Sequence, residues 1–187
     1  MANRTVANEL WVEQLGVKGC SWLSVLTGSM APLIRPHDRV LVTRVETSKI
    51  RSGDIVAFRR FDNIIVHRVL HAQRYGGSIH FQEKGDARYF SRPVRGEDII
   101  GRVTTLKKGE KVIHFNTPPG RFASLCYGVW SDITVKTISP FRSSSHRPMR
   151  LFGTLLERLF LLFSNVIIVP CLLVWSTFRP SSENNTR

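Results

Sequence analysis

Between residues 38 and 115, apolar and polar positions alternate in short segments that predict β-strands. The segments are rich in β-branched side chains and are bounded by Gly, Pro, Asp or Ser. Gly76-Gly77 indicates a hairpin, and residues 108–110 indicate another. The predicted strands cover residues 38–45, 54–60, 64–72, 78–84, 99–106 and 111–115. This pattern predicts a mainly β fold, a compact antiparallel β-domain.

The flanking segments change this pattern. The start of the chain predicts a short amphipathic helix followed by a loop. A short helix is expected at residues 122–133, and a Ser-, Pro- and Arg-rich stretch predicts a linker. The predicted divisions are an N-terminal amphipathic segment at 1–26, the β-domain at 27–138, the linker at 139–150, a hydrophobic helix at 151–178 and a tail at 179–187.

A run of twenty residues without formal charge, at 159–178, is the most apolar part of the chain. A helix of that length would span about 30 Å, the thickness of the hydrocarbon layer. We therefore expect a single-pass C-terminal membrane helix, with Asn165 and Pro170 favouring a buried or surface-lying helix as the alternative. No N-terminal export signal is expected, because polar residues interrupt every apolar stretch of the opening segment. The basic residues before the run outnumber those after it, which favours a cytoplasmic domain.

The composition narrows the function only slightly. The net charge of +13 would suit nucleic acid, anionic lipid or an acidic substrate. The basic residues are scattered, so no nucleic-acid partner is expected. Three cysteines without short spacing predict neither a disulfide framework nor a zinc site, and we expect no cofactor and no metal.

The segment Thr27-Gly28-Ser29-Met30-Ala31-Pro32 carries the first candidate chemistry. It places Ser29 at a bend before the strands, where Gly28 lets the backbone come close to a substrate. A serine needs a base to become a good nucleophile, and His67 in the strand Ile65-Val66-His67-Arg68-Val69 is the candidate. A lone histidine in a strand is more often structural, so these two residues alone decide little.

The ordered set of motifs decides more. In sequence come GSMAP, RPHDRVLV, SGDIVAF, IVHRV, KGDA and IIGRV, within residues 27–103. This set resembles the signal peptidase I superfamily of S24/S26-like serine peptidases, and in particular its endoplasmic-reticulum-type and archaeal branch. In that branch a histidine stands where most bacterial enzymes have a lysine base. The resemblance implies a signal-peptidase-like β-domain that cleaves a signal or leader sequence from a precursor near a membrane.

The resemblance also implies the roles of single residues. Ser29 would be the nucleophile and His67 the general base. The Ser29 amide, helped by the Thr27 hydroxyl, would bind the oxyanion. Asp86 of KGDA is the remaining candidate to orient His67, because the later aspartate of close relatives is missing here. Met30 and Pro32 would shape the substrate groove, with a purely structural role as the alternative.

Several alternatives stay open. His67 could act in a Ser-His dyad, with Asp86 only fixing a loop. Neither Lys49 nor Lys84 occupies the position of a lysine base. A cytoplasmic domain conflicts with cleavage on the outer face of a membrane, so the side of the membrane stays open. The chain could instead be a maturation peptidase that trims one dedicated precursor from the cytoplasmic side, or a catalytically impaired homologue that binds peptides by strand addition. A self-cleaving repressor is disfavoured, because 26 residues before the serine motif cannot hold a DNA-binding domain.

Overall fold

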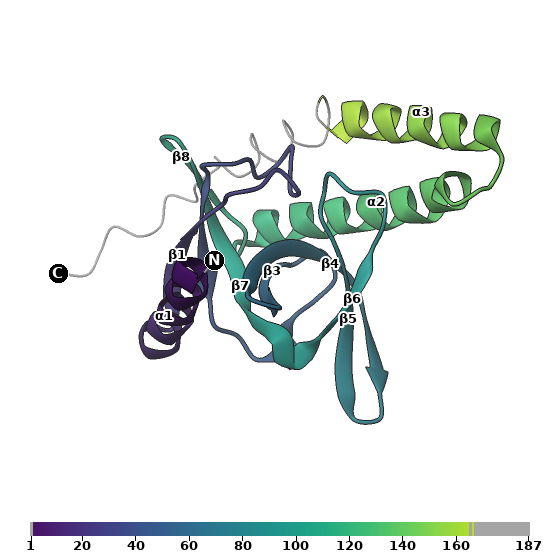
Figure 1. The fold of residues 1–187 in the computed structure, drawn as a ribbon. Helices are drawn as coiled ribbons and strands as arrows, with labels where there is room; N and C mark the ends of the chain where they lie inside the picture. The colour runs from purple at the N-terminus through teal and green to yellow at the C-terminus, as the bar shows by residue number, and fades with distance from the viewer. Residues whose placement is uncertain (1, 165, 167–187) are drawn as a thin grey trace.

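A computed structural model of the protein describes residues 2–164 and 166. Its centre is one strongly curved, wholly antiparallel sheet of eight strands (Figure 1). The strands are β1 (Cys20–Ser24), β2 (Arg39–Thr43), β3 (Ile55–Arg60), β4 (Asn63–Tyr75), β5 (Ser78–Lys84), β6 (Arg92–Arg95), β7 (Ile99–Lys108) and β8 (Lys111–His114). Their order is β1-β2-β7-β3-β4-β5-β6, and β8 pairs with β7. The antiparallel β-domain expected from the sequence is thus found.

All six predicted strands are present, and both predicted hairpins connect the expected pairs. The sequence analysis missed β1 and β6. β1 falls in the segment expected to be a loop, and its five residues pair with β2 along their whole length. β6 is a four-residue strand next to β5 that contains Pro93, a residue that sheets accept at an edge. The sequences of these two strands, CSWLS and RPVR, do not alternate between apolar and polar residues.

The apolar core lies in two clusters on opposite faces of β3. Ile55 and Ala57 belong to one cluster, and Val56 and Phe58 belong to the other. The first cluster includes Met30 of the serine motif at 1% exposure, which fixes the floor beneath the candidate nucleophile. Because successive strand residues point to opposite faces, one short strand can anchor both clusters.

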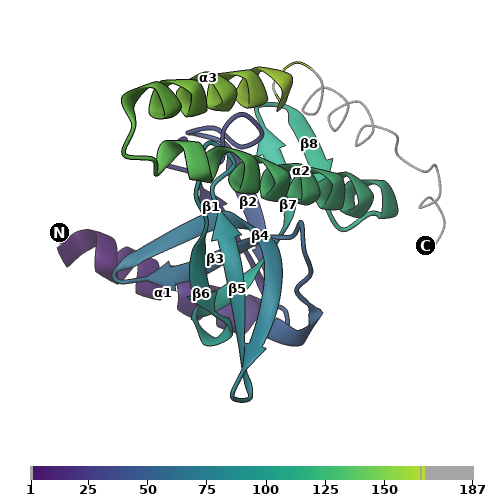
Figure 2. The ribbon, with the colours of Figure 1, turned by 90° about the vertical axis from the view of Figure 1, so that its right-hand side faces the viewer.

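Three α-helices and two short 3-10 helices surround the sheet: α1 (Ala2–Lys18), α2 (Pro118–Arg142), α3 (Arg147–Phe163), η1 (Thr47–Lys49) and η2 (Gly96–Asp98). α1 packs against β1, while α2 packs against β4 and carries α3 on its other side (Figure 2). Thr117 caps α2 by accepting a hydrogen bond from the Gly120 amide at 3.2 Å. α2 is twice as long as the predicted helix, and the predicted linker is mostly helical, with only residues 143–146 between α2 and α3.

The predicted single-pass anchor is contradicted. Across residues 2–164 and 166, no helix combines the length and the apolar character that a bilayer crossing needs. α3 contains the start of the apolar run, and its two sides differ: Leu155, Leu159 and Leu162 are exposed, whereas Glu157 and Phe160 line a cavity beside α2. The rest of the run, at 165 and 167–178, lies outside the described residues.

Candidate active site

A groove of about 650 Å³ runs beside the serine motif. One wall comes from the end of β1 and the residues after it, including Leu23 and Val25. The other wall comes from Ile64 and Val66 of β4. These aliphatic walls are part of, or packed against, the first core cluster, so they are held firmly. Ser29 and His67 both line this groove.

Ser29 and His67 lie within hydrogen-bonding distance. The Oγ atom of Ser29 is 3.0 Å from Nε2 of His67, although the residues are 38 positions apart. Ser29 sits in a turn in which the Ala31 amide donates to the Gly28 carbonyl and the Ile34 amide donates to the Met30 carbonyl, both at 3.0 Å. His67 lies in the middle of β4, paired with Val56 of β3. A rigid turn and a central strand therefore set the distance between the two side chains.

Glu83 is the carboxylate that contacts the candidate base. Its Oε2 atom lies 2.5 Å from Nδ1 of His67, and its Oε1 atom accepts a hydrogen bond from Arg60 at 2.8 Å. The side chain is only 2% exposed. Burial opposes ionisation of Glu83, but the hydrogen bonds and charges of His67 and Arg60 outweigh it and hold the pKa of Glu83 below its ordinary value. Glu83 is thus a carboxylate at neutral pH.

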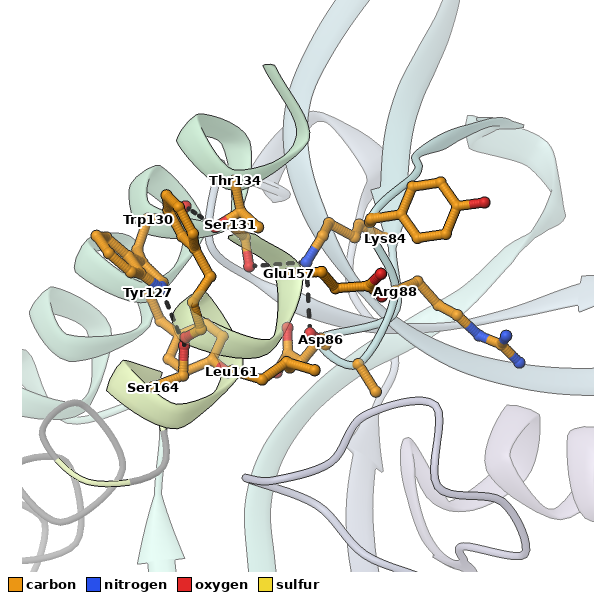
Figure 3. Close-up of a pocket in the computed structure, with 13 residues that line it drawn as sticks. Lys84, Asp86, Arg88, Tyr127, Trp130, Ser131, Thr134, Glu157, Leu161 and Ser164 are labelled. Carbon is orange, nitrogen blue, oxygen red and sulfur yellow. Dashed lines mark hydrogen bonds between the residues drawn. The ribbon is translucent and has the colours of Figure 1, made fainter. Parts of the chain in front are cut away.

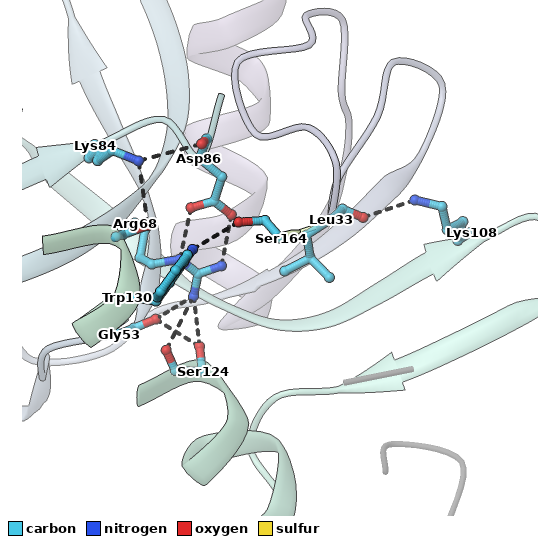
Figure 4. Close-up of polar contacts among 10 residues, drawn as sticks. Leu33, Gly53, Arg68, Lys84, Asp86, Lys108, Ser124, Trp130 and Ser164 are labelled. Carbon is cyan, nitrogen blue, oxygen red and sulfur yellow. Dashed lines mark hydrogen bonds and ion pairs between the residues drawn. The ribbon is translucent and has the colours of Figure 1, made fainter. Parts of the chain in front are cut away.

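Asp86, expected to orient His67, binds a different residue. Its two oxygens accept hydrogen bonds from Arg68 at 2.9 and 2.8 Å, with both side chains fully buried (Figure 4). Arg68 also donates to the Gly53 carbonyl at 2.9 Å and to the Ser124 hydroxyl of α2 at 3.1 Å. Its guanidinium stacks on the Tyr127 ring, 4.4 Å from the centroid. In the structure, therefore, His67 contacts Glu83, and Asp86 forms a buried ion pair with Arg68.

The register of β4 and β5 explains why Glu83, and not Asp86, contacts His67. The pairing begins with Tyr75 opposite Ser78, and without interruption it would bring His67 opposite Asp86. A bulge between Val69 and His71 shifts the register by one residue. A one-residue shift moves side chains to the other face of a sheet. Val69 now lies opposite Glu83, so Glu83 shares the face of His67 as its diagonal neighbour.

Gly85 lets three parts of the site meet. A β-carbon at this position would lie 2.6 Å from the Ser29 carbonyl oxygen, 3.0 Å from Nε2 of His67 and 3.3 Å from Cγ of Arg88. Two residues later, the Ala87 amide donates a hydrogen bond to the same Ser29 carbonyl at 2.9 Å. The loop that carries Asp86 therefore holds the backbone of the candidate nucleophile. Asp86 can influence Ser29 through this loop without touching His67.

The other predicted site residues lie around Ser29. The Thr27 hydroxyl is exposed and lies 3.4 Å from Ser29 Oγ, so it is on the side from which a substrate would approach. Met30 lies under the groove, within the core. Pro32 is buried and is not among the described residues that line the groove. A structural role therefore fits Pro32 better than contact with a substrate does.

Lys84 is not placed to act as a base for Ser29. Its side chain is buried on the other face of β5, where Nζ lies 3.4 Å from the Asp86 carbonyl oxygen and 3.5 Å from the Ser131 hydroxyl of α2 (Figure 3). Burial lowers the pKa of Lys84 to about 8, although the nearby Asp86 carboxylate opposes this effect. Because Lys84 lies directly opposite Arg68, it shares the face of the buried ion pair.

The geometry of the Ser29, His67 and Glu83 side chains allows a proton to pass from Ser29 to His67. A carboxylate can only accept hydrogen bonds, so Nδ1 of His67 donates to Glu83 and Nε2 is left to accept the Ser29 proton. This orientation is the one that a serine hydrolase needs for its nucleophile and base. The Ser29 side chain opens to the groove of about 650 Å³ described above.

Comparison with known families agrees with this class. The model of the family described as Peptidase S24-like matches residues 4–104, which is more than half of the chain. The chain belongs to the Peptidase S24-like family. Members of this family are serine peptidases, some of which cleave themselves, and this supports a hydrolase. No curated protein sequence matches the chain.

Proposed function

We propose that this protein is a serine endopeptidase that uses Ser29, His67 and Glu83. The observation that carries the proposal is the hydrogen-bonded series from Ser29 Oγ through His67 to Glu83, which opens on the groove. Ser29 Oγ attacks the carbonyl carbon of a peptide bond while His67 takes its proton, and His67 then gives that proton to the leaving amine. Water releases the acyl group from Ser29 in the second half of the reaction.

The Ser29 amide and the Thr27 hydroxyl are the proposed donors to the oxyanion. An oxyanion hole requires donors about 3 Å from the position that the negative oxygen takes in the transition state. Thr27 stands two residues before the nucleophile and 3.4 Å from its oxygen, which supports this role. Glu83 stabilises the positive charge that His67 acquires during the same step.

The proposed substrate is a precursor protein from which a leader or signal segment is removed. The order of motifs from GSMAP to IIGRV supports this substrate class, and the open groove with aliphatic walls supports binding of an extended segment. The membrane stays a predicted partner. The contact between Glu83 and His67 favours the peptidase over the catalytically impaired peptide-binding homologue, because it supplies the base with a carboxylate partner.

The proposal is tested by comparing the termini of cellular proteins. Cells that produce the wild type, Ser29→Ala or His67→Ala are analysed by mass spectrometry, with Ser48→Ala as the control because Ser48 is exposed and lies in η1, outside the groove. We expect new termini, created by cleavage of a precursor, in the samples with the wild type and the control. These termini should be missing from the samples with either site variant. Equal termini in all four samples would refute the endopeptidase.

A fluorophosphonate probe gives a second test that needs no substrate. Such a probe reacts with an activated serine and should label Ser29 of the wild type and of Ser48→Ala. Labelling should fall about a hundredfold or more in His67→Ala, since the alcohol then has no base. Equal labelling with and without His67 would show that this histidine does not activate Ser29.

A further inference from the structure

The groove carries positive charge that no ion pair neutralises among the residues that the structure describes. Arg88 and Arg92 both line the groove, and both are exposed. Among the residues that the structure describes, neither forms an ion pair, whereas the third arginine of the groove, Arg60, is held by Glu83 and the Pro93 carbonyl. Glu83 is also the only carboxylate among the described lining residues, and both of its oxygens are already engaged.

The two free guanidinium groups are placed by neighbouring residues. Arg88 follows the loop that holds Ser29, and the same Gly85 position lies beside Ser29, His67 and the Arg88 stem. Figure 3 shows the Arg88 side chain turned away from the buried Lys84 and Ser131. Arg92 stacks on the Phe90 ring, 4.9 Å from its centroid, and Phe90 lines the groove as well. This contact limits the positions that the Arg92 guanidinium can take.

We infer that the groove selects peptide segments with an acidic side chain close to the cleaved bond, and that Arg88 and Arg92 are the residues that recognise it. The aliphatic walls accept apolar side chains, and the two guanidinium groups accept an aspartate or glutamate carboxylate by charge-assisted hydrogen bonds. A segment with lysine or arginine in the same place would be repelled. The inference rests on the proposed function and specifies its substrate class.

Cleavage of a peptide library tests the selectivity. Proteome-derived peptides are digested with the wild type, with the double variant Arg88→Gln/Arg92→Gln, and with Arg74→Gln as the control. Arg74 is an exposed arginine near the tip of the β4–β5 hairpin and does not line the groove. We expect Asp and Glu to be enriched within three positions of the cut for the wild type and the control, and not for the double variant. A wild type without acidic enrichment, or a double variant that keeps it, would overturn the inference.

A binding measurement separates this inference from the proposed chemistry. Fluorescent peptides that share one aliphatic sequence and differ only in a central Glu, Gln or Lys are titrated with Ser29→Ala protein, which cannot cut them. We expect the Glu peptide to bind about three- to tenfold more tightly than the Gln peptide at low salt, and this preference to shrink at high salt. Adding Arg88→Gln/Arg92→Gln should abolish it, and adding Arg74→Gln should not.

The two experiments fail in different ways. If no peptide is cleaved but the Arg-dependent preference for Glu is found, the endopeptidase is refuted and the acidic selectivity stands. If peptides are cleaved and neither experiment shows a preference for acids, the selectivity is refuted and the endopeptidase stands.

Discussion

Replacing Glu83 by glutamine separates the role of this residue from that of Asp86. The glutamine side chain has nearly the same shape, but only one of its two polar atoms can accept a hydrogen bond. The Arg60 guanidinium has only donors and lies 2.8 Å from Oε1 of Glu83. In the variant it will therefore hold the amide oxygen of the glutamine, which can accept its hydrogen bond. The amide NH₂ group then points at Nδ1 of His67, 2.5 Å away in the wild type. His67 must therefore carry its proton on Nε2, where it cannot accept the proton of Ser29.

The expected loss follows from this change of tautomer. In serine peptidases the equivalent carboxylate-to-amide replacement lowers kcat about 10⁴-fold, which is a barrier increase of about 5.5 kcal/mol. The fold should survive, because Glu83→Gln keeps the volume of the side chain and Arg60 is partly exposed, at 22%. The measurement is the rate of fluorophosphonate labelling or of peptide cleavage, together with urea unfolding. A Glu83→Gln protein with activity within tenfold of the wild type would refute the assignment.

Asp86→Asn is the matched comparison and should behave in the opposite way. Asp86 neutralises the fully buried Arg68, and an uncompensated buried charge typically costs about 3–5 kcal/mol of stability. We expect a lower urea midpoint and, for the protein that remains folded, a loss of kcat below about tenfold. A normal midpoint combined with a loss of orders of magnitude in kcat would instead return the orienting role to Asp86.

Three further predictions concern residues close to the site. Because burial lowers the pKa of Lys84 to about 8 from 10.5, the unfolded chain binds more protons between these values, so wild-type stability should rise with pH by up to about 3 kcal/mol across that window. Urea unfolding at pH 7.5 and 10 should show this rise, and it should be absent from Lys84→Met. Gly85→Ala should lower activity about a hundredfold or more and stability by about 1–3 kcal/mol, because its β-carbon would collide with the Ser29 carbonyl; an alanine variant with normal kcat and urea midpoint would contradict the close approach. Thr27→Val should reduce kcat about 10²- to 10³-fold without moving the urea midpoint, and an unchanged kcat would remove Thr27 from the oxyanion hole.

The sequence predicted most of the sheet because its strands alternate clearly and its hairpins contain glycine. It also indicated Ser29 and His67, which the turn and β4 bring together. Their catalytic roles stay a prediction until the variants are measured.

The carboxylate was harder to predict because it depends on one bulge. The Gly76-Gly77 hairpin sets a register in which Asp86 would lie opposite His67. No residue type near Val69 indicates the bulge that places Glu83 beside His67 instead. If one bulge is allowed in this hairpin, the alternation of side chains along β5 puts Glu83 on the face of His67 and makes it a candidate. The membrane prediction was wrong for another reason: it was made from hydropathy along the run alone, whereas the part of the run within α3 packs Phe160 and Phe163 against Trp130 of α2.

The buried Arg68 also decides how the protein can be divided for study. Its shell includes Ser124 and Tyr127 of α2, whereas the part of the chain that matches the peptidase family ends at residue 104. A fragment cut at that limit would divide β7, remove β8, and expose Arg68 and Asp86 to water beside the loop that holds Ser29. Expression trials should therefore keep α2, and removal of this helix should inactivate the enzyme even though α2 contributes no residue to the groove among those described.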